Sequence, residues 1–309
     1  MNKRVLFEIK GMYRDDFRVT GYEFGEGEKS VCVVGNSRGN EVQQIYCCSQ
    51  LVKKMKQLEE EGRIKKGHKI LIIPSLNPYS VNIQKRFWPT DNTDINRMFP
   101  GYDLGETTQR IADGIFREIS EYKYGIQFTS FYMPGDFVPH IRYMKEGFTT
   151  REEAEKFGMK YIVERSVRPY DTATLNYNWQ VWETTAFSMY TSTTERISDT
   201  GAGQAVLSVM NFLANNGIIK YSAIGVRRNR FIEDSELISV RTEKSGFFEP
   251  LVKAGEKVEA GKPLAHILNP YEGTILETLY APLDGTIFFI HNAPITYANT
   301  AVIKVLEDE

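Results

Sequence analysis

Two short polar motifs contain the residues with the clearest chemical potential. The first, Gly35-Asn36-Ser37-Arg38-Gly39-Asn40-Glu41, follows an apolar run and places a cation three residues before a carboxylate. The second, Asp94-Ile95-Asn96-Arg97-Met98-Phe99-Pro100-Gly101, comes after Asn77-Pro78 and Arg86. A guanidinium and a carboxylate this close in sequence can form charge-assisted hydrogen bonds. The residues that could carry chemistry are therefore concentrated in turns that follow two predicted strands.

The order and spacing of these motifs resemble the succinylglutamate desuccinylase/aspartoacylase family, relatives of the zinc carboxypeptidases that hydrolyse N-acyl amino acids. The likeness runs from about residue 30 to the C-terminus, and D-x-N-R-x-F-P-G after N-P is its most specific part. The resemblance implies that Arg86, Asn96 and Arg97 bind the substrate. It also implies a small anionic ligand, an N-acyl amino acid or a similar carboxylate.

The resemblance also locates a zinc site, and this sequence departs from it. Relatives read G-x-x-H-G-N/D-E in the first turn and D-L-H at the end of the third strand, and the two His and the Glu bind zinc. Glu41 matches the carboxylate ligand, but Arg38 and Gln127 stand at the two histidine positions. Arginine has no lone pair to donate and an amide is a poor zinc ligand, whereas catalytic zinc needs three protein ligands. We therefore expect a degenerate site in which zinc, the family's cofactor, is doubtful.

Arg38 and His140 are the two residues that could occupy the expected zinc position. Arg38 can fill part of the space of the zinc and neutralise Glu41, or it can point to solvent from a surface turn. His140 is the histidine close enough after the third predicted strand to substitute as a ligand, although a lone histidine is more often structural. The sequence thus leaves two alternatives for Arg38, which are an internal ion pair with Glu41 and an exposed position at the surface.

The catalytic glutamate of the family has a match at Glu195, in Ser192-Thr193-Thr194-Glu195-Arg196-Ile197. In relatives this residue sits in a T-x-E-x-G context and activates the zinc-bound water. The glycine two residues after Glu195 is absent here. The alternative reading is a solvated glutamate at a strand end.

Three functional hypotheses follow from these residues. The first is a metal-poor family member that binds a small anionic ligand, or an impaired hydrolase. The second is an active metal-dependent deacylase that uses substitute ligands such as Gln127 and His140. The third is a scaffold in which a C-terminal β-unit mediates oligomerisation. Whether the chain is an enzyme, and whether it forms a homo-oligomer, stays open at this point.

The elements that must position these residues alternate between strands and helices. The predicted strands are short apolar runs, and the predicted helices repeat apolar residues at helical spacing; the strands lie at 31–35, 68–78, 124–131 and 186–195, and the helices near 42–58, 107–119 and 206–213. A capping pattern at Thr150 and Glu153 predicts a short inserted helix. Such alternation indicates an α/β domain, a zinc carboxypeptidase-like mixed sheet flanked by helices.

The pattern of apolar residues and turns changes after about residue 221. Short apolar runs separated by glycine turns predict a small all-β barrel-sandwich domain over 222–309, behind an α/β domain over 1–221. Its turns resemble those of biotinyl and lipoyl carrier modules. The corresponding hairpin, LNPYEG, offers no lysine for modification, so a carrier role is not expected.

Bulk composition excludes several functional classes. The 309 residues carry a formal net charge of -2 and no apolar run long enough to span a membrane, so neither nucleic acid nor a membrane is an expected partner. The three cysteines, Cys32, Cys47 and Cys48, do not form a disulfide framework. A reducing cytoplasm is the expected location.

Overall fold

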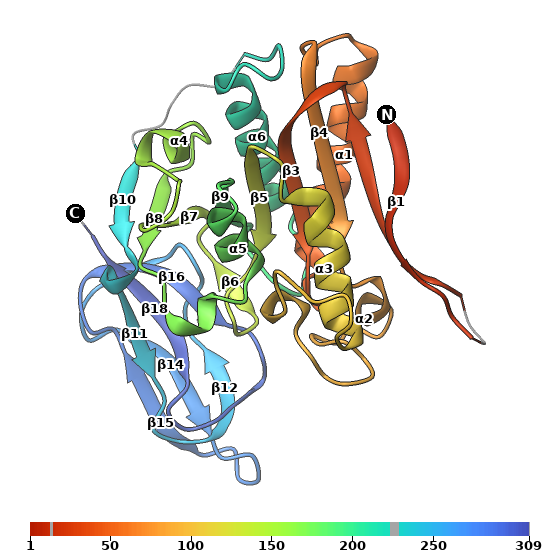
Figure 1. Cartoon of the computed structure of the whole chain (residues 1–309). Coiled ribbons are helices and arrows are strands. Elements are labelled where there is room, and N and C mark those ends of the chain that lie inside the picture. The colour runs from red at the N-terminus through yellow and green to blue at the C-terminus, as the bar shows by residue number, and fades with distance from the viewer. Residues whose placement is uncertain (13–14, 223–228, 309) are drawn as a thin grey trace.

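The computed structural model describes residues 1–12, 15–222 and 229–308, and a large mixed sheet dominates it (Figure 1). Among these residues, nine strands form that sheet in the order β1-β2-β4-β3-β5-β9-β7-β8-β10. Their bounds are β1 Asn2–Ile9, β2 Phe17–Phe24, β3 Gly27–Asn36, β4 Gly67–Ser75, β5 Tyr124–Thr129, β7 His140–Met144, β8 Tyr161–Arg165, β9 Thr185–Tyr190 and β10 Arg230–Glu233. The central strands β4, β3, β5 and β9 are parallel, whereas β2 and β7 run antiparallel to their central neighbours. The predicted mixed sheet is confirmed, and the β1–β2 hairpin is an addition that the sequence patterns did not predict.

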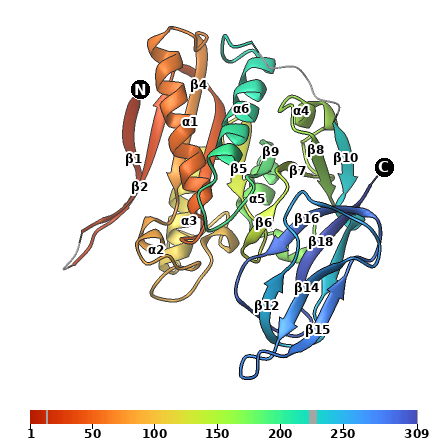
Figure 2. The same ribbon diagram turned by 180° about the vertical axis from the view of Figure 1, so that it is seen from behind.

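Helices cover both faces of this sheet. The longest are α1 (Val42–Glu60) and α6 (Asp199–Asn215), which pack together on one face, while α3 (Thr107–Ile119) and α5 (Leu175–Val181) lie on the other (Figures 1 and 2). Two single-turn helices, α2 (Pro78–Asn82) and α4 (Arg151–Glu155), complete the layer structure. The side chain of Thr150 caps α4 by accepting a hydrogen bond from the Glu153 amide, as the sequence predicts.

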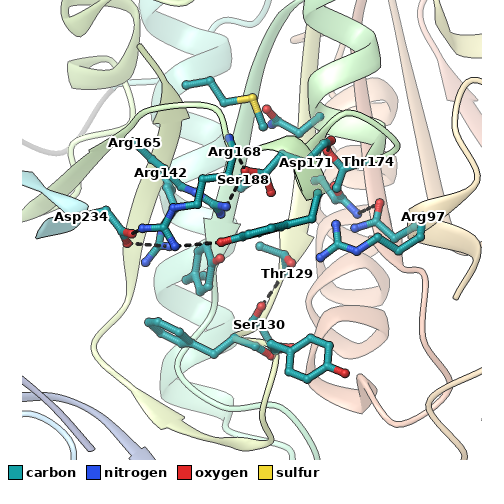
Figure 3. Close-up of a pocket in the computed structure, with 18 of the residues that line it drawn as sticks. Arg97, Thr129, Ser130, Arg142, Arg165, Arg168, Asp171, Thr174, Ser188 and Asp234 are labelled. Carbon is teal, nitrogen blue, oxygen red and sulfur yellow. Dashed lines mark hydrogen bonds and ion pairs between the residues drawn. The ribbon is translucent and has the colours of Figure 1, made fainter. Parts of the chain in front are cut away.

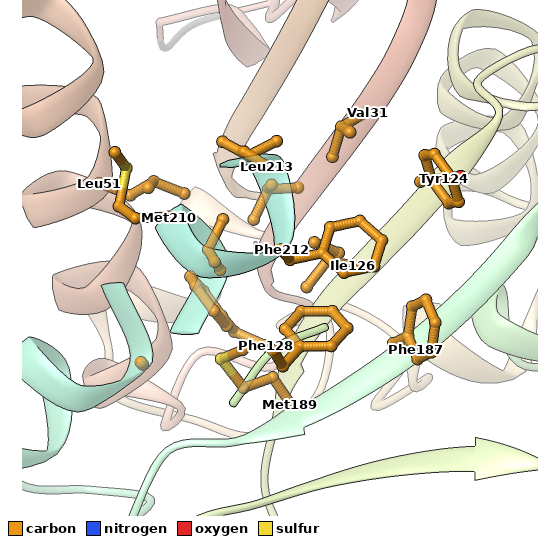
Figure 4. Close-up of a cluster of buried hydrophobic side chains, with 14 of the residues drawn as sticks. Val31, Leu51, Tyr124, Ile126, Phe128, Phe187, Met189, Met210, Phe212 and Leu213 are labelled. Atoms are coloured by element: carbon orange, nitrogen blue, oxygen red, sulfur yellow. The ribbon is translucent and has the colours of Figure 1, made fainter. Parts of the chain in front are cut away.

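The core divides into two clusters because successive residues of a strand point to opposite faces of the sheet. Val31 and Val33 of β3 pack towards α1 and α6, together with Phe128 and Phe212 (Figure 4). Cys32 and Val34 point the other way; their cluster includes Ile111, Ile115, Leu175 and Trp179 of α3 and α5. All three cysteines are buried and unpaired, which agrees with a structural role for them.

The C-terminal part of the chain is all-β in its described residues. One sheet has the order β11-β18-β16-β13 and the other the order β15-β14-β12-β17. Their bounds are β11 Leu237–Arg241, β12 Gly246–Pro250, β13 Lys257–Val258, β14 Pro263–Leu268, β15 Ile275–Tyr280, β16 Gly285–His291, β17 Ile295–Thr296 and β18 Ala301–Glu307. The one helical element described after residue 229 is a single 3₁₀ turn, Asp234–Glu236. A β-unit built from short strands and glycine turns therefore follows the α/β part, as expected.

The two parts of the chain are joined by strand pairing as well as by the connecting segment. β6 (Gly135–Phe137), which follows β5 in sequence, pairs antiparallel with β16 of the C-terminal unit. Conversely, β10 lies after the connecting segment yet joins the large sheet beside β8. The boundary expected at residue 221 lies next to residues 223–228, outside the described part, and it stays a prediction.

None of the described helices combines the length and the apolarity that crossing a bilayer requires.

Candidate functional site

A pocket of about 530 Å³ opens beyond the C-terminal ends of the parallel strands β3, β5 and β9 (Figure 3). This is where open α/β sheets usually bind their ligands. Strand β5 contributes Gln127 and Thr129, and β9 contributes Ser188 and Tyr190. Other walls come from the 3₁₀ turn Ile95–Arg97, from β7 and β8, and from β18 of the C-terminal unit. The size suits a small molecule.

Arg38 points into the protein beside this pocket and forms two buried ion pairs. Its Nη1 lies 3.1 Å from Glu41 Oε1 and its Nε lies 2.9 Å from Asp94 Oδ2. The side chains are 5%, 2% and 9% exposed for Arg38, Glu41 and Asp94. Burial alone would lower the pKa of the guanidinium, but the two carboxylates raise it above its usual value. Arg38 is thus a permanent cation, and sequence reasoning had not identified Asp94 as its second partner.

The carboxylate of Glu41 has no free acceptor position. Oε1 accepts hydrogen bonds from Arg38 Nη1 (3.1 Å) and from Ser130 Oγ (3.0 Å). Oε2 accepts from the backbone amides of Ser37 and Arg38, both at 3.2 Å. A carboxylate offers about four lone-pair positions, so protein donors use all of them. A metal could bind Glu41 only by displacing these donors.

The other residues expected at the metal position do not complete a donor set. Gln127 donates from Nε2 to Asn96 Oδ1 over 3.3 Å. Both ring nitrogens of His140 have partners, since Nδ1 lies 2.7 Å from the Val138 carbonyl and Nε2 lies 3.4 Å from Arg142 Nη2. In the described ranges, no group of three or more His, Cys, Asp or Glu side chains could hold a metal ion. The residues at this position therefore do not fit zinc.

Two of the residues predicted to bind substrate face the pocket with free donors. The Arg97 side chain is half-buried, lines the pocket and forms no hydrogen bond or ion pair with any described residue (Figure 3). Asn96 is buried, and its Oδ1 accepts from Gln127 Nε2 and from the Leu175 amide. Its Nδ2 group has no partner among the described residues. A guanidinium and an amide NH₂ are thus available to an anionic or carbonyl group.

Arg86 lies behind the pocket wall. Its Nη1 donates to the Tyr132 carbonyl, and its guanidinium lies 4.3 Å from the centre of the Tyr132 ring. Burial and the nearby charge of Arg38 lower its pKa to about 10. Nε and Nη2 are buried without a partner. Arg86 therefore does not line the pocket directly, and it contacts it through Tyr132.

Glu195 lies outside the lining of the pocket. It is exposed, and its Oε1 accepts a hydrogen bond from Asn40 Nδ2 over 2.8 Å. The physical reason is that β9 ends at Tyr190, after which Ser192 adopts a positive φ of 95° and turns the chain. Arg38 and Arg97 line the pocket, whereas Glu195 does not. The pocket positions at the end of β9 are instead Ser188 and Tyr190, neither of which is an acid.

Sequence reasoning missed four cations on the wall opposite Arg97. Arg142, Arg165 and Arg168 come from β7, from β8 and from the segment after β8, and Lys304 comes from β18. Arg165 pairs with Asp171 at 2.5 Å, and Asp234 pairs with both Arg142 and Arg168. A signal was present, because Arg142 and Lys304 stand inside the largely apolar strands HIRYM and AVIKVLE.

The burial of His140 predicts a pH-dependent stability. Burial, followed by the charge of Arg142, lowers its pKa well below the usual range, so the folded protein keeps the ring neutral. The unfolded chain takes up the proton below about pH 6.5, and stability should fall by up to ~1.4 kcal/mol per pH unit there. His140→Phe should make the fall in stability with decreasing pH shallower. Part of the fall should remain, because burial also lowers the pKa of His291. Urea unfolding at pH 7.5, 6.5 and 5.5 measures the slopes; equal slopes in both proteins would contradict the assignment.

Comparison with known proteins agrees with this architecture. Residues 27–130 match the sequence profile of the succinylglutamate desuccinylase/aspartoacylase catalytic domain. Over these residues the chain is similar to this family. An N-alpha-acetyl-L-2,4-diaminobutyric acid deacetylase from Halomonas elongata is 24% identical over 282 residues, which are 87% of this chain and 79% of the relative.

Solved structures of family members share the whole fold. A succinylglutamate desuccinylase/aspartoacylase from Rhodobacter sphaeroides superimposes with a TM-score of 0.79 at 21% identity, covering 95% of this chain and 90% of that one. The product-bound ectoine utilization protein EutE (DoeB) from Ruegeria pomeroyi gives a TM-score of 0.78 at 20% identity, with the same coverage. The desuccinylase/aspartoacylase family is one of N-acyl amino acid deacylases. The zinc carboxypeptidase-like fold predicted from the motifs is therefore confirmed.

Proposed function

We propose that this protein binds a small carboxylate, an N-acyl amino acid or a similar compound, without the zinc-dependent hydrolysis of its relatives. The observation that carries the proposal is the buried ion network of Arg38 with Glu41 and Asp94. This network supplies a fixed positive charge where relatives by resemblance hold a metal. The pocket beside it keeps cationic and amide donors for a ligand.

The free donors of the pocket support the binding part of this proposal. The Arg97 guanidinium has no partner among the described residues, and an uncompensated guanidinium in a half-buried site favours an anion. Asn96 offers its amide nitrogen from the same turn. The deacetylase relative acts, by its name, on an N-acetylated amino acid, and such a molecule carries one carboxylate and one amide carbonyl. Arg97 would bind the carboxylate and Asn96 the carbonyl.

The second part of the proposal, that the protein does not hydrolyse its ligand, is supported by the lack of a free general base among the described residues of the pocket. Activating water without a metal requires a general base within reach of it. The acids that line the pocket are Asp171 and Asp234, and arginines hold both of them in ion pairs. Glu41 has no free acceptor position, and Glu195 lies outside the lining. We therefore place this protein among the metal-poor binders, and the roles of Glu195 in catalysis and of His140 as a ligand stay predictions.

Replacement of Arg97 tests the binding proposal. Arg97→Ala should weaken the affinity for N-acetyl amino acids by about 10- to 100-fold, the value of one or two charge-assisted hydrogen bonds. Titration calorimetry with N-acetylated amino acids, in buffer containing a chelator, measures the affinity. Arg110→Ala, at an exposed position of α3, is the matched control and should bind as the unmodified protein does. Binding that requires added zinc, or equal affinity of both variants, would refute the proposal.

A further inference from the structure

The outer face of one C-terminal sheet is apolar where solvent would favour polar residues. In the sheet β15-β14-β12-β17, Phe248, Leu264 and Ile267 point inward and pack in the core of the C-terminal unit. The alternate residues of each strand point outward, and on an antiparallel sheet with one solvated face they are usually polar. The outward apolar residues that are exposed or half-buried here are Phe247, Leu251, Leu268, Ile275, Leu276, Tyr280, Ile295 and Tyr297. This composition is typical of a sheet that is covered on both faces.

Four of these residues form a continuous row across the sheet. Phe247 of β12 is in register with Ile295 of β17 on one side and with Leu268 of β14 on the other. Leu268 is in turn in register with Ile275 of β15. Residues directly opposite each other on paired strands have neighbouring side chains on the same face, so the row crosses all four strands. Ile295, Phe247 and Ile275 are 53%, 42% and 56% exposed.

A polar row lies beside this apolar row. Glu249 of β12 is in register with His266 of β14, and His266 is in register with Thr278 of β15. Nδ1 of His266 lies 3.1 Å from the Thr278 hydroxyl, while Nε2 has no partner among the described residues. The Glu249 carboxylate also forms no hydrogen bond or ion pair with a described residue. The outer face therefore offers an unpaired carboxylate and an unpaired imidazole nitrogen on neighbouring strands.

The two rows are complementary to themselves. Strands β14 and β12 are the central pair of the sheet. When two such sheets pack face to face, a twofold axis that runs between these strands and parallel to them places β12 of one copy over β14 of the other. The apolar row then covers the apolar row of the second copy, with Phe247 over Leu268. In the polar row, Glu249 of each copy lies over His266 of the other, so each carboxylate gains a charge-assisted partner.

The area and position of the face suit such a contact. A specific interface buries about 800 Å² on each partner; half-exposed large apolar side chains present on the order of 100 Å² each, so the outward residues supply an area of this order. The largest apolar patch of a typical monomer is about 300 to 600 Å². The C-terminal unit joins the α/β part through β16, in its other sheet, and β14 and β15 lie in its outer part (Figures 1 and 2). A formal net charge of -2 gives little repulsion between two copies.

We propose that the outer face of the sheet β15-β14-β12-β17 is the interface of a homodimer, in which a second copy of this chain is related by a twofold axis between β12 and β14. The dimer buries the apolar row and forms two pairs between Glu249 of one copy and His266 of the other. This inference goes beyond the proposed function and is independent of it, because the interface residues do not line the pocket.

Sedimentation velocity tests the association. The unmodified protein should be a dimer at about 10 μM, a concentration at which a specific interface is largely occupied. Phe247→Asp places a charge in the middle of the apolar row and should raise the dissociation constant at least about 100-fold. Leu104→Asp introduces the same charge at an exposed leucine before α3 and is the matched control, which should leave the dimer intact. A monomeric unmodified protein, or equal dissociation constants for the two variants, overturns the proposal.

Charge exchange tests the orientation of the two copies. At about pH 6.5 a histidine is half protonated, so Glu249→Lys should place like charges opposite each other, and His266→Glu should oppose two carboxylates. Each variant alone should dimerise at least about tenfold more weakly. An equimolar mixture should recover the dimer, because the two introduced residues then face each other, as do the unmodified Glu249 and His266.

The mixture also decides the case in which Phe247→Asp does not fold, since both exchanged residues occupy polar outward positions. A mass of two chains that appears only on mixing supports the proposed interface. A mixture that associates no better than its separate components overturns it.

Discussion

Arg38→Ala should destabilise the protein by about 3 to 5 kcal/mol, the cost of removing one partner of a buried ion pair. The substitution leaves Glu41 and Asp94 with uncompensated negative charge in a site where their side chains are 2% and 9% exposed. The Ser130 hydroxyl and the backbone amides of residues 37 and 38 still donate to Glu41, whereas Asp94 loses its ion-pair partner. Chemical unfolding at pH 7.5 measures the effect.

The matched control for this loss is an arginine with two ion pairs at the surface. Arg117 contacts Asp103 and Asp113, and its side chain is 65% exposed. Arg117→Ala should leave the unfolding midpoint nearly unchanged, because solvent screens such pairs. A second variant, Arg38→Lys, keeps the charge but not the fork that reaches both carboxylates, and it should fall between the two. If Arg38→Ala were as mild as Arg117→Ala, the buried network would not be structural.

The double replacement Arg38→His with Gln127→His should create a zinc site. Removal of the guanidinium frees one acceptor position on Glu41, and two imidazoles beside it give the His₂Glu set that suffices for catalytic zinc. Asp94, which now holds Arg38 Nε, is placed to orient the new imidazole at position 38. The variant should be unstable without metal and recover about 2.7 kcal/mol at zinc concentrations 100-fold above Kd.

Metal analysis and thermal unfolding with and without zinc check this result. Arg38→His and Gln127→His alone are the controls, and each should bind zinc far more weakly because it supplies two ligands instead of three. A double variant that takes up no zinc would mean that Gln127 and Glu41 do not face a common point. The assignment of the family's metal position to these residues would then be wrong.

The sequence predicted the elements of the fold well because their local signals agree with their tertiary environment. The helix expected at 107–119 is α3 to the residue, and the strand expected near 31–35 lies inside β3. The strand expected at 186–195 was too long, since β9 ends at Tyr190. The cause is a run of β-forming residues that continues past the point where Ser192 turns the chain. A positive φ at serine has no sequence signal comparable to that of glycine.

The site was predictable only where motif residues lie close in sequence. Arg38 and Glu41 are three residues apart, so their pairing follows from one turn. The pocket cations Arg142, Arg165, Arg168 and Lys304 come from elements spread over more than half of the chain, and only the arrangement of β7, β8, the segment after β8 and β18 brings them together. No local pattern could show that Asp234 would form ion pairs with both Arg142 and Arg168.

The pairing of β6 with β16 means that the C-terminal unit is not an interchangeable module. Gly135 to Phe137 find their sheet partners at His291 to Phe289, so a chain that stopped at residue 221 would expose an unpaired strand. The same truncation would remove Lys304 and open one wall of the pocket. Recombination that exchanged this unit for another β-domain would have to rebuild both a strand register and one wall of the pocket. Substitutions in the α/β part and in the C-terminal β-unit are therefore coupled, because both parts line the pocket.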